Sequence, residues 1–436
     1  MTGRYKTYPE YRDSGVAFLG DIPLGWKPMK IKHFGSLKGG AGFPHSEQGN
    51  KDQKYNFYKV NALGKAGSTG ELLQSKDTIS ELTANNLGAY IFPPKTIVFA
   101  KVGAALLLGR IRSLSKPACI DNNMMGLVVE KDHCPDFVKY AMQLVKFDFL
   151  VNPGAVPSLN EFQMGNCYLA FAPYEEQQQI ANFLDHETSK IDTLIEKQEK
   201  LIELLKEKRQ AVISHAVTKG LNPDAPMKDS GVEWLGEVPE HWKACPLKTI
   251  SKFRQGKLHE PYIHEDGKFI CVNSRFVSTE GEKFKYCSKN LSPVENEDIL
   301  MVMSDLPNGR ALAKALFVQG DNNFALNQRV CAITATEIDA RFLYYQLNRN
   351  EYFLSFDDGC NQTNLSNYVF KNFPALVPYK AEQCEIAEYL DRQTESFDRL
   401  VEIANRQIEL MKERKTALIS AAVTGKIDVR DWEGEA

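Results

Sequence analysis

Two stretches of the sequence combine basic side chains with Asn or Gln, which are residue types that can read bases in DNA. The first candidate set is Lys101, Arg110, Arg112, Lys116 and Asn123. The second candidate set is Arg275, Arg310, Lys314, Gln328 and Arg329. In the major groove, Arg forms bidentate hydrogen bonds with guanine, whereas Asn and Gln form them with adenine. If these side chains lie on loops, both stretches are candidate DNA-reading surfaces.

The short motifs that support catalysis are missing from the sequence. Gly425-Lys426 has no upstream glycine at the spacing of a phosphate-binding loop. We also find no G-x-G-x-x-G loop, no Asn/Asp-Pro-Pro-aromatic tetrad of an amino-methyltransferase, and no G-x-S-x-G motif. His259 and His264 lack the Cys or carboxylate set of a zinc site. We therefore expect no catalytic residue, no metal site and no cofactor in this chain.

The elements that position the candidate residues are revealed by an internal duplication. The motif Asp-Ser-Gly-Val-x-x-Leu-Gly-x-x-Pro-x-x-Trp occupies residues 13–26 and recurs at residues 229–242. Residues 175–218 and 381–424 are identical at 21 of 44 ungapped positions. Solenoid repeats are much shorter than this, so the pattern indicates two duplicated domains.

The regions between the matched blocks, residues 27–173 and 243–379, are mostly dissimilar. We align three short pairs across them: Thr96-Ile97-Val98 with Asp298-Ile299-Leu300, Asn123 with Asn327, and Ser158-Leu159-Asn160 with Asn364-Leu365-Ser366. The sequence thus has similar frames around different contents.

Each second matched block is predicted to be a long helix with one apolar stripe. The stripe residues are Leu184, Ile191, Ile195, Ile202, Leu205 and Val212 in the first copy, and Leu390, Phe397, Val401, Ile408, Met411 and Leu418 in the second. Their steps of seven, four and three residues are those of a coiled-coil seam. Such a seam needs a partner, and the two copies are available to pair. Either direction is open in principle, but the short linker favours an antiparallel pair with pseudo-two-fold symmetry.

The net charge of −3 comes from 53 basic and 56 acidic residues, and it is unevenly distributed. Residues 27–173 carry 17 Lys and Arg against 11 Asp and Glu, and residues 243–379 carry 16 against 15. The linker and tail are acidic. Because only the variable regions are positive, the overall charge does not argue against nucleic-acid binding.

The nine cysteines form no C-x-x-C pair, and the N-terminus does not resemble a signal peptide. The longest apolar runs are too short to span a bilayer. We expect a soluble cytoplasmic protein without membrane contact.

These motifs together resemble the specificity (S) subunit of type I restriction–modification enzymes. Each variable region is followed by Pro-x₂₋₃-Glu-Gln-x-x-Ile-Ala and a heptad helix that ends in Ala-Val-Thr, as in that family. The resemblance implies a mixed α+β fold, with two α/β target recognition domains joined by two long antiparallel coiled-coil helices. The implied segments are an N-terminal frame segment with the first recognition domain (1–173), a spacer helix (174–220), a linker (221–242), the second recognition domain (243–379), a second spacer helix (380–426) and an acidic tail (427–436).

The resemblance also implies a function. The chain would be a non-catalytic subunit that reads a bipartite, asymmetric site in double-stranded DNA, one domain per half-site. Two modification (methyltransferase) subunits and the restriction (translocase/nuclease) subunits would supply adenine-N6 methylation and ATP-dependent cleavage, with S-adenosylmethionine, ATP and Mg bound there. The candidate subunit-docking residues are Glu176, Gln177, Ile180, Glu382, Gln383 and Ile386. A stand-alone bivalent DNA-binding protein, or a helical scaffold acting without a methyltransferase, is the alternative.

Overall fold

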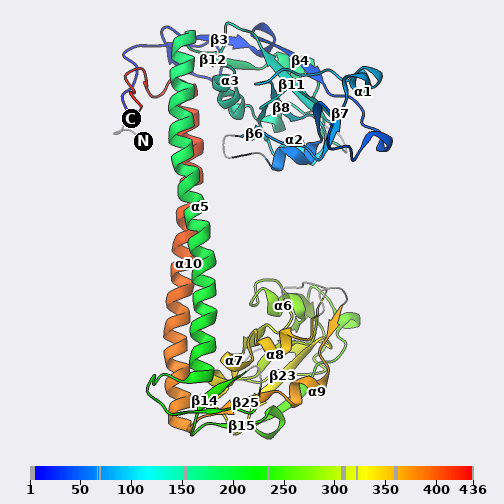
Figure 1. Ribbon diagram of the computed structural model, residues 1–436, viewed down its shortest axis with the longest axis vertical. Coiled ribbons are helices and arrows are strands. Elements are labelled where there is room, and N and C mark those ends of the chain that lie inside the picture. Colours follow the sequence, from blue (N-terminus) through cyan, green and yellow to red (C-terminus); the bar gives the residue numbers. More distant parts are fainter. Residues whose placement is uncertain are drawn as a thin grey trace. The chain divides into compact units, whose positions relative to one another are not determined.

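The computed structural model describes residues 5–65, 67, 70–151, 156–232, 235–305, 311–320, 323–357 and 362–434. It divides into two compact units, residues 1–200 with 405–436, and residues 201–404. Each unit combines a region of strands and short helices with part of two long helices, α5 (Tyr174–Lys219) and α10 (Lys380–Val423) (Figure 1). This mixed architecture confirms the predicted fold class.

Among the described residues, the first unit contains four sheets. Its strands are β1 (Tyr11–Asp13), β2 (Asp21–Pro23), β3 (Lys27–Lys30), β4 (Gly35–Gly39), β5 (Tyr55–Tyr58), β6 (Glu71–Leu72), β7 (Asp77–Ile79), β8 (Ile97–Ala100), β9 (Arg112–Leu114), β10 (Ala118–Ile120), β11 (Met124–Val129) and β12 (Tyr168–Phe171). Its short helices are α1 (Glu81–Asn86), α2 (Ala104–Leu107), α3 (Pro135–Ala141) and α4 (Glu161–Gly165), and the 3₁₀ helix η1 spans Ile31–His33.

The second unit contains five sheets within its described ranges. Its strands are β13 (Met227–Asp229), β14 (Glu237–Pro239), β15 (Lys243–Pro246), β16 (Ser251–Gln255), β17 (Phe269–Val272), β18 (Tyr286–Cys287), β19 (Ile299–Val302), β20 (Ser304–Asp305), β21 (Ala315–Phe317), β22 (Phe324–Leu326), β23 (Val330–Ala335), β24 (Thr363–Asn364) and β25 (Pro374–Val377). Its short helices are α6 (Ser274–Ser278), α7 (Ala340–Leu347), α8 (Glu351–Leu354) and α9 (Asn367–Lys371), and the 3₁₀ helix η6 spans Leu247–Thr249.

The two dissimilar regions share most of their strand order, although β6 of the first unit has no counterpart strand in the second. The first unit has sheets of order β4-β11-β8-β9-β6 and β10-β5-β7, and the second has β16-β23-β19-β21 and β22-β17-β18. The pairs β5–β10 and β17–β22 are parallel in both units. The duplication therefore extends through regions where the sequences no longer match.

Strands β8 and β19 are inner strands of these sheets, and every residue in them is buried. This burial explains their uninterrupted apolar sequences, because a strand covered on both faces needs no polar alternation. Ile97 of β8 pairs with Leu127, and Ile299 of β19 pairs with Ile333, in equivalent strand pairs. The predicted alignment of Ile97 with Ile299 is thus confirmed.

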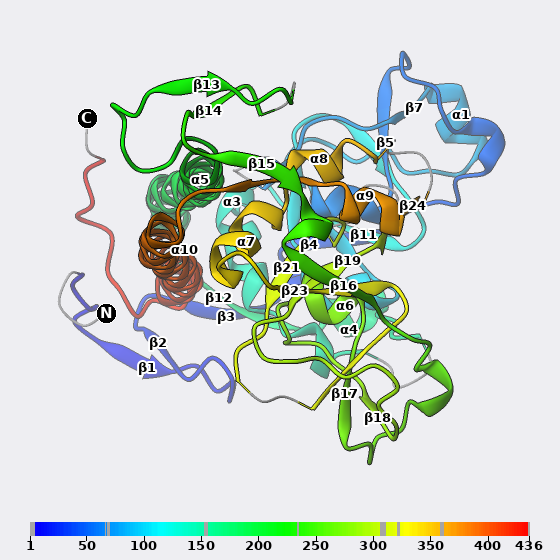
Figure 2. The same ribbon diagram turned by 90° about the horizontal axis from the view of Figure 1, so that it is seen from below.

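The repeated frame motif forms a hairpin in each unit. In the first, the Asp13 carboxylate accepts a hydrogen bond from the Gly15 amide at 2.9 Å, and Gly15 has a φ of +69° that favours glycine. The side chain of Trp26, which ends the motif, is buried. Figure 2 shows the equivalent hairpin β13–β14 beside α5, where Lys219 donates a hydrogen bond to the carbonyl of Glu237.

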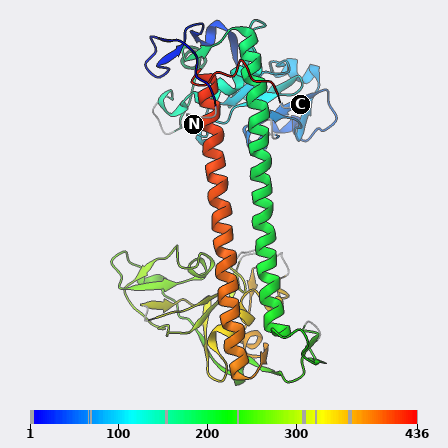
Figure 3. The ribbon, with the colours of Figure 1, turned by 90° about the vertical axis from the view of Figure 1, so that its left-hand side faces the viewer.

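The two long helices pack against each other within each unit (Figure 3). In the first unit, Lys415 Nζ lies 2.6 Å from a carboxylate oxygen of Asp192, and in the second, Arg209 Nε lies 3.4 Å from Asp398. From the first ion pair to the second, the position on α5 advances by 17 residues while that on α10 falls by 17. The helices are therefore antiparallel, as predicted.

The predicted seam residues are all buried or half-buried. Leu184, Ile191, Ile195, Leu390, Phe397, Ile408 and Leu418 are buried, and Ile202, Leu205, Val212, Val401 and Met411 are half-buried. By contrast, Leu194, Leu204 and Leu410, which lie off the stripe, are 48–49% exposed. The heptad phase read from the sequence thus identifies the packed face, whereas the spacer role of these residues stays a prediction.

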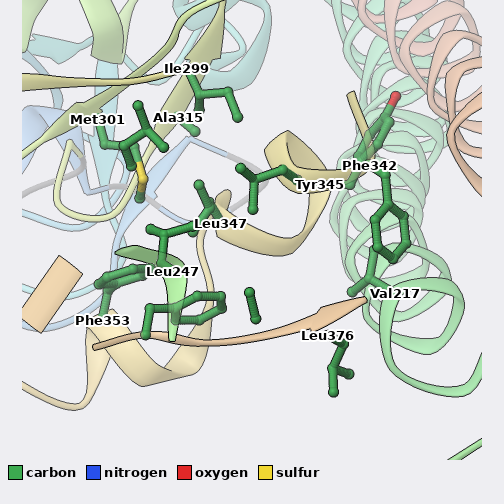
Figure 4. Close-up of a cluster of buried hydrophobic side chains, with 14 of the residues drawn as sticks. Val217, Leu247, Ile299, Met301, Ala315, Phe342, Tyr345, Leu347, Phe353 and Leu376 are labelled. Atoms are coloured by element: carbon green, nitrogen blue, oxygen red, sulfur yellow. The ribbon is translucent and has the colours of Figure 1, made fainter. Parts of the chain in front are cut away.

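The core of the second unit joins the long helices to the globular region. Val217 of α5, Phe342 of α7 and Leu376 of β25 belong to one buried cluster (Figure 4). Trp242, which ends the frame motif of this unit, is fully buried in the same cluster. Within the described ranges, no helix is both long and apolar enough to cross a membrane.

Candidate nucleic-acid interface

One exposed turn occupies the same place in both units, and we name these two segments the recognition turns. The first comprises residues 121–123 between β10 and β11, and the second comprises residues 327–329 between β22 and β23. Each turn is closed by the backbone, since the Met124 amide donates to the Asp121 carbonyl at 3.0 Å and the Val330 amide donates to the Asn327 carbonyl at 2.9 Å. In both turns, the second and third residues are exposed.

A glycine holds each recognition turn against the neighbouring strand. The Gly40 amide donates to the Met124 carbonyl at 3.1 Å, and the Gly256 amide donates to the Val330 carbonyl at 3.0 Å. A Cβ atom on Gly40 would lie 2.0 Å from the Asp121 carbonyl oxygen, and one on Gly256 would lie 2.2 Å from that of Asn327. Only glycine fits at these positions. The sequence signal for them was a glycine directly after an alternating strand, in Lys38-Gly39-Gly40 and Gln255-Gly256.

These contacts correct one sequence alignment. Asn123 does not correspond to Asn327, because the residue that closes the first turn with its carbonyl is Asp121. Asn123 corresponds to Arg329 instead, as the third residue of the turn. An isolated Asn match carries no information about register, whereas the backbone hydrogen bonds of a turn define it.

Each recognition turn is bonded to the residue that follows a strand, and that residue is bonded to the segment that precedes a short helix. In the first unit, the Lys101 amide donates to the Asn123 carbonyl at 2.8 Å, and the Leu159 amide donates to the Lys101 carbonyl at 2.9 Å. In the second unit, the Met303 amide donates to the Arg329 carbonyl at 2.9 Å, and the Leu365 amide donates to the Met303 carbonyl at 2.7 Å.

These bonds confirm the predicted alignment of Leu159 with Leu365. They also bring together Lys101 and Asn123 of the first candidate set. In the second candidate set, Gln328 and Arg329 are neighbours on the recognition turn, and both are exposed.

The two recognition turns differ in chemistry at matching positions. The first begins with Asp121. Burial raises the pKa of its carboxyl group, and backbone hydrogen bonds from Asn123 and Val60 only partly oppose this effect. The second begins with the buried amide of Asn327, which donates to a carboxylate oxygen of Glu260 at 3.2 Å. The exposed residues are two amides in the first turn and an amide with a guanidinium in the second. Amides can pair with adenine and a guanidinium can pair with guanine, so the two turns offer different hydrogen-bonding groups at matching positions.

Two other candidate DNA-reading residues have internal partners. Arg112 donates from Nε to the Leu63 carbonyl at 3.0 Å and from Nη1 to the Ile111 carbonyl at 2.8 Å. Burial, and secondarily the charge of Arg110, lowers the pKa of Arg112. Lys314 donates to the Ser278 carbonyl at 2.8 Å and lies 2.9 Å from Glu280.

The remaining candidates are scattered. Arg110 and Lys116 are exposed on either side of β9, which β8 separates from β11 and its recognition turn. Arg275 is exposed on α6, and Arg310 lies outside the described residues. The structure therefore does not bring either candidate set together as a whole.

The predicted docking glutamates contact the frame tryptophans. Trp26 donates from Nε1 to Glu176 at 2.9 Å, and Trp242 donates to Glu382 at 3.1 Å. Tyr8 also donates to Glu176, and burial together with this contact raises the pKa of the Tyr8 hydroxyl.

The predicted docking glutamines and isoleucines are buried. Gln177 accepts from the Cys134 amide and donates to the Ala172 carbonyl, both at 2.9 Å. Gln383 makes the equivalent bonds with Asp339 at 2.7 Å and Pro378 at 2.8 Å. Ile180 and Ile386 are fully buried. The repeated Glu-Gln-x-x-Ile motif thus connects the start of each long helix to its globular region, and subunit docking through these residues stays a prediction.

A tyrosine in each unit ties a short helix to a long helix. Tyr140 of α3 donates to Asp185 at 2.6 Å and lies 3.3 Å from the Thr188 hydroxyl. Tyr345 of α7 donates to Asp391 at 2.7 Å and lies 3.2 Å from the Thr394 hydroxyl. Burial, with the nearby carboxylate, raises the pKa of both phenols. Asp185 and Asp391 are visible in the sequence as identities of the repeat, but their tyrosine partners are not.

His, Cys, Asp and Glu side chains form no group of three or more suited to a metal ion in the part of the chain that the structure describes. The arrangement is that of two exposed turns with hydrogen-bonding side chains, each supported by backbone contacts. Such a surface can bind a ligand by hydrogen bonds.

Comparison with known proteins identifies similar chains. A family model described as the type I restriction modification DNA specificity domain matches residues 23–204 and 239–412. The MjaVIII specificity subunit of Methanocaldococcus jannaschii is 25% identical over 336 residues, covering 73% of this chain and 76% of that protein. The putative MjaX specificity subunit of the same organism is 25% identical, covering 94% of this chain and 96% of its own length. The StySPI specificity subunit of Salmonella potsdam is 22% identical, covering 95% and 92%.

Two solved structures share the fold. A chain from a study of complex assembly and conformational transition in the type I R–M system has a TM-score of 0.69 at 12% identity, covering 92% of this chain and 98% of that one. The HsdS subunit of Thermoanaerobacter tengcongensis has a TM-score of 0.52 at 13% identity, covering 93% and 98%.

Proposed function

The chain belongs to the family of type I restriction–modification DNA specificity domains, and from this premise we propose that it reads a bipartite, asymmetric DNA site. Recognition of a DNA sequence within a type I restriction–modification system is the function of the family. The proposal assigns one half-site to each unit and one recognition turn to each half-site. Family membership does not favour the stand-alone DNA-binding protein or the scaffold.

The observation that carries the proposal is the pair of recognition turns. Both turns have the same backbone bonds, but Asn122 and Asn123 occupy the positions held in the other unit by Gln328 and Arg329. Two unlike half-sites require equivalent backbone frameworks that carry different exposed side chains. Base contacts give specificity, whereas contacts common to both half-sites fix the position of the protein on the DNA.

The partners in this proposal are two modification subunits and the restriction subunits. They supply methyl transfer, with S-adenosylmethionine, and ATP- and Mg-dependent cleavage. The duplicated frame supports two equivalent docking positions, since each long helix begins with the same Glu-Gln-x-x-Ile arrangement. The role left to this chain is to place those partners on chosen bases.

The experiment is methylome sequencing of cells that express the modification subunits with the wild-type chain or with exchanged turns. Replacing Asn122-Asn123 by Gln-Arg should change the methylated sequence in one half-site and leave the other half-site and the gap between them intact. Replacing Gln328-Arg329 by Asn-Asn should change the opposite half-site. An unchanged methylated sequence in both variants would contradict the assignment of the recognition turns, and the absence of methylation in cells with the wild-type chain would contradict the function.

A further inference from the structure

The two units share an exposed aromatic side chain outside the recognition turns. Phe162 in α4 is 77% exposed, and Tyr368 in α9 is 76% exposed. Both follow the segment that is bonded to the strand end beside the recognition turn, three residues after Leu159 and Leu365. A single exposed aromatic residue is ordinary, but its recurrence at equivalent places in two dissimilar sequences indicates a common use.

The same contacts hold the backbone of both aromatic residues. The Asn166 side chain donates to the Phe162 carbonyl at 2.9 Å and accepts from Lys32 Nζ at 3.0 Å. The Asn372 side chain likewise donates to the Tyr368 carbonyl at 2.9 Å and accepts from Lys248 Nζ at 3.2 Å. We name each set of aromatic, asparagine and lysine a clamp.

The clamp recurs in both units, although its residues lie within the dissimilar regions 27–173 and 243–379. Lys32 lies on η1 and Lys248 on η6, and the first residue of each 3₁₀ helix bonds back to the chain just after the clamp asparagine. The Ile31 amide donates to the Cys167 carbonyl at 3.0 Å, and the Leu247 amide donates to the Phe373 carbonyl at 2.9 Å. A ligand of the clamps must therefore be common to both units.

Lysines lie beside both clamps, and in the first unit the exposed carboxylate of Glu161 also adjoins Phe162. Lys32 and Lys248 are exposed, and neither is ion-paired with a carboxylate among the described residues. Lys30 reaches the same Asn166 oxygen at 3.3 Å in the first unit, and Lys371 adjoins the clamp asparagine in the second. An aromatic side chain flanked by lysines is complementary to a nucleic-acid backbone and its stacked bases.

We propose that the two clamps bind the duplex without regard to sequence, with Lys32 and Lys248 on phosphates and the rings of Phe162 and Tyr368 against sugars or a base step. This inference rests on the proposed function, because it assumes that each unit holds DNA. It accounts for the duplication, since the sugar–phosphate backbone is the part of the DNA that two different half-sites share. It also separates two tasks that adjoin in the fold, with position fixed by the clamps and sequence read by the recognition turns.

The test uses the full chain in complex with its modification subunits and two labelled duplexes. One duplex carries the bipartite site found by methylome sequencing, and the other has the same length and no such site. Phe162→Ala and Tyr368→Ala should each weaken binding to both duplexes by about tenfold, through loss of the apolar contact that the ring makes with the duplex. Because both duplexes are affected alike, the ratio of the two affinities should stay unchanged.

A lysine variant and a control sharpen the result. Lys32→Gln should reduce the slope of log affinity against log salt concentration by about one phosphate contact. Phe18→Ala serves as the control, since Phe18 is 69% exposed on the first frame hairpin and is not part of a clamp, and its affinities should match the wild type.

Three outcomes would overturn the inference. A loss confined to the duplex that carries the site would make the aromatic residues base readers. Unchanged affinity for both duplexes would remove the clamps from the DNA interface. Loss of the modification subunits from the complex, with DNA affinity retained by the complexes that remain, would make the clamps a protein interface. If the wild-type complex does not distinguish the two duplexes, the proposed function itself fails, whatever the variants do.

Discussion

Replacing Gly40 by alanine tests whether a single close contact holds the first recognition turn. The new Cβ atom would lie 2.0 Å from the Asp121 carbonyl oxygen and 2.3 Å from that of Ile120, so the two segments must separate by about 1 Å. That separation stretches the Gly40–Met124 and Ala41–Ile120 backbone hydrogen bonds, which measure 3.1 and 3.0 Å.

The expected cost follows from these contacts. Two backbone hydrogen bonds contribute about 1 kcal/mol each, and forcing a methyl group into packed backbone costs about 1–3 kcal/mol. Alanine also restricts the unfolded chain, which returns about 0.4–1 kcal/mol. We therefore expect Gly40→Ala to lower the free energy of unfolding of the first unit by about 3 kcal/mol.

Equilibrium unfolding in urea, followed by the fluorescence of the buried Trp26 in a background with the other three tryptophans replaced by phenylalanine, measures this difference. Gly42→Ala is the matched control, since a Cβ atom there meets nothing within 4 Å, and its stability should be within about 0.5 kcal/mol of the wild type. In the methylation assay, Gly40→Ala should weaken recognition of one half-site. The reasoning is refuted if Gly40→Ala unfolds at the wild-type urea concentration, or if Gly42→Ala is equally destabilised.

Three further perturbations follow from the described contacts. Tyr140→Phe removes the donor to Asp185 and should destabilise the first unit by about 1–2 kcal/mol in urea unfolding, whereas an unchanged midpoint would show that this hydroxyl does not tie α3 to α5. Asp192→Asn should lower the free energy of unfolding by about 1 kcal/mol, because its ion pair with Lys415 is largely shielded from solvent. Asp398→Asn should lower it by less than about 0.5 kcal/mol, because Asp398 is 68% exposed. Equal losses of stability in the two variants would contradict this ranking. Burial lowers the pKa of His133, so the unfolded chain binds more protons than the folded chain below about pH 6.5. The free energy of unfolding should therefore fall as the pH drops from about 7 toward 5. Unfolding curves measured in parallel should show a weaker pH dependence for His133→Gln.

The long helices were predictable because periodicity over many turns outweighs local ambiguity. Leu184 and Leu390 begin stripes that keep the same phase as far as Val212 and Leu418, and a heptad pattern of that length is rarely produced by anything but a long packed helix. The frame hairpins were likewise recognisable, since Gly15 and Trp26 belong to a motif that occurs twice.

The shared topology of the globular regions could not be predicted, because it depends on strands of two to six residues whose sequences do not match. What the two regions share is backbone pairing, which many side chains satisfy equally well. Gly40 and Gly256 are visible in the sequence only as glycines that follow an alternating segment, and nothing short of the fold shows that each faces a carbonyl oxygen. Tyr140 and Tyr345 were missed for a similar reason, because their partners lie 45 and 46 residues away.

The duplication separates what the molecule keeps from what it varies. The clamps, the tyrosine ties and the tryptophan–glutamate contacts recur with nearly the same distances in both units, although the surrounding sequences differ. The recognition turns keep their backbone bonds but replace Asn122-Asn123 by Gln328-Arg329. Under the proposed function, a new half-site requires changes only at exposed turn residues, because the bonds that fix each turn come from the backbone. The same proposal requires a positive charge at only a few such positions, so 16 basic residues against 15 acidic ones in residues 243–379 are compatible with DNA recognition.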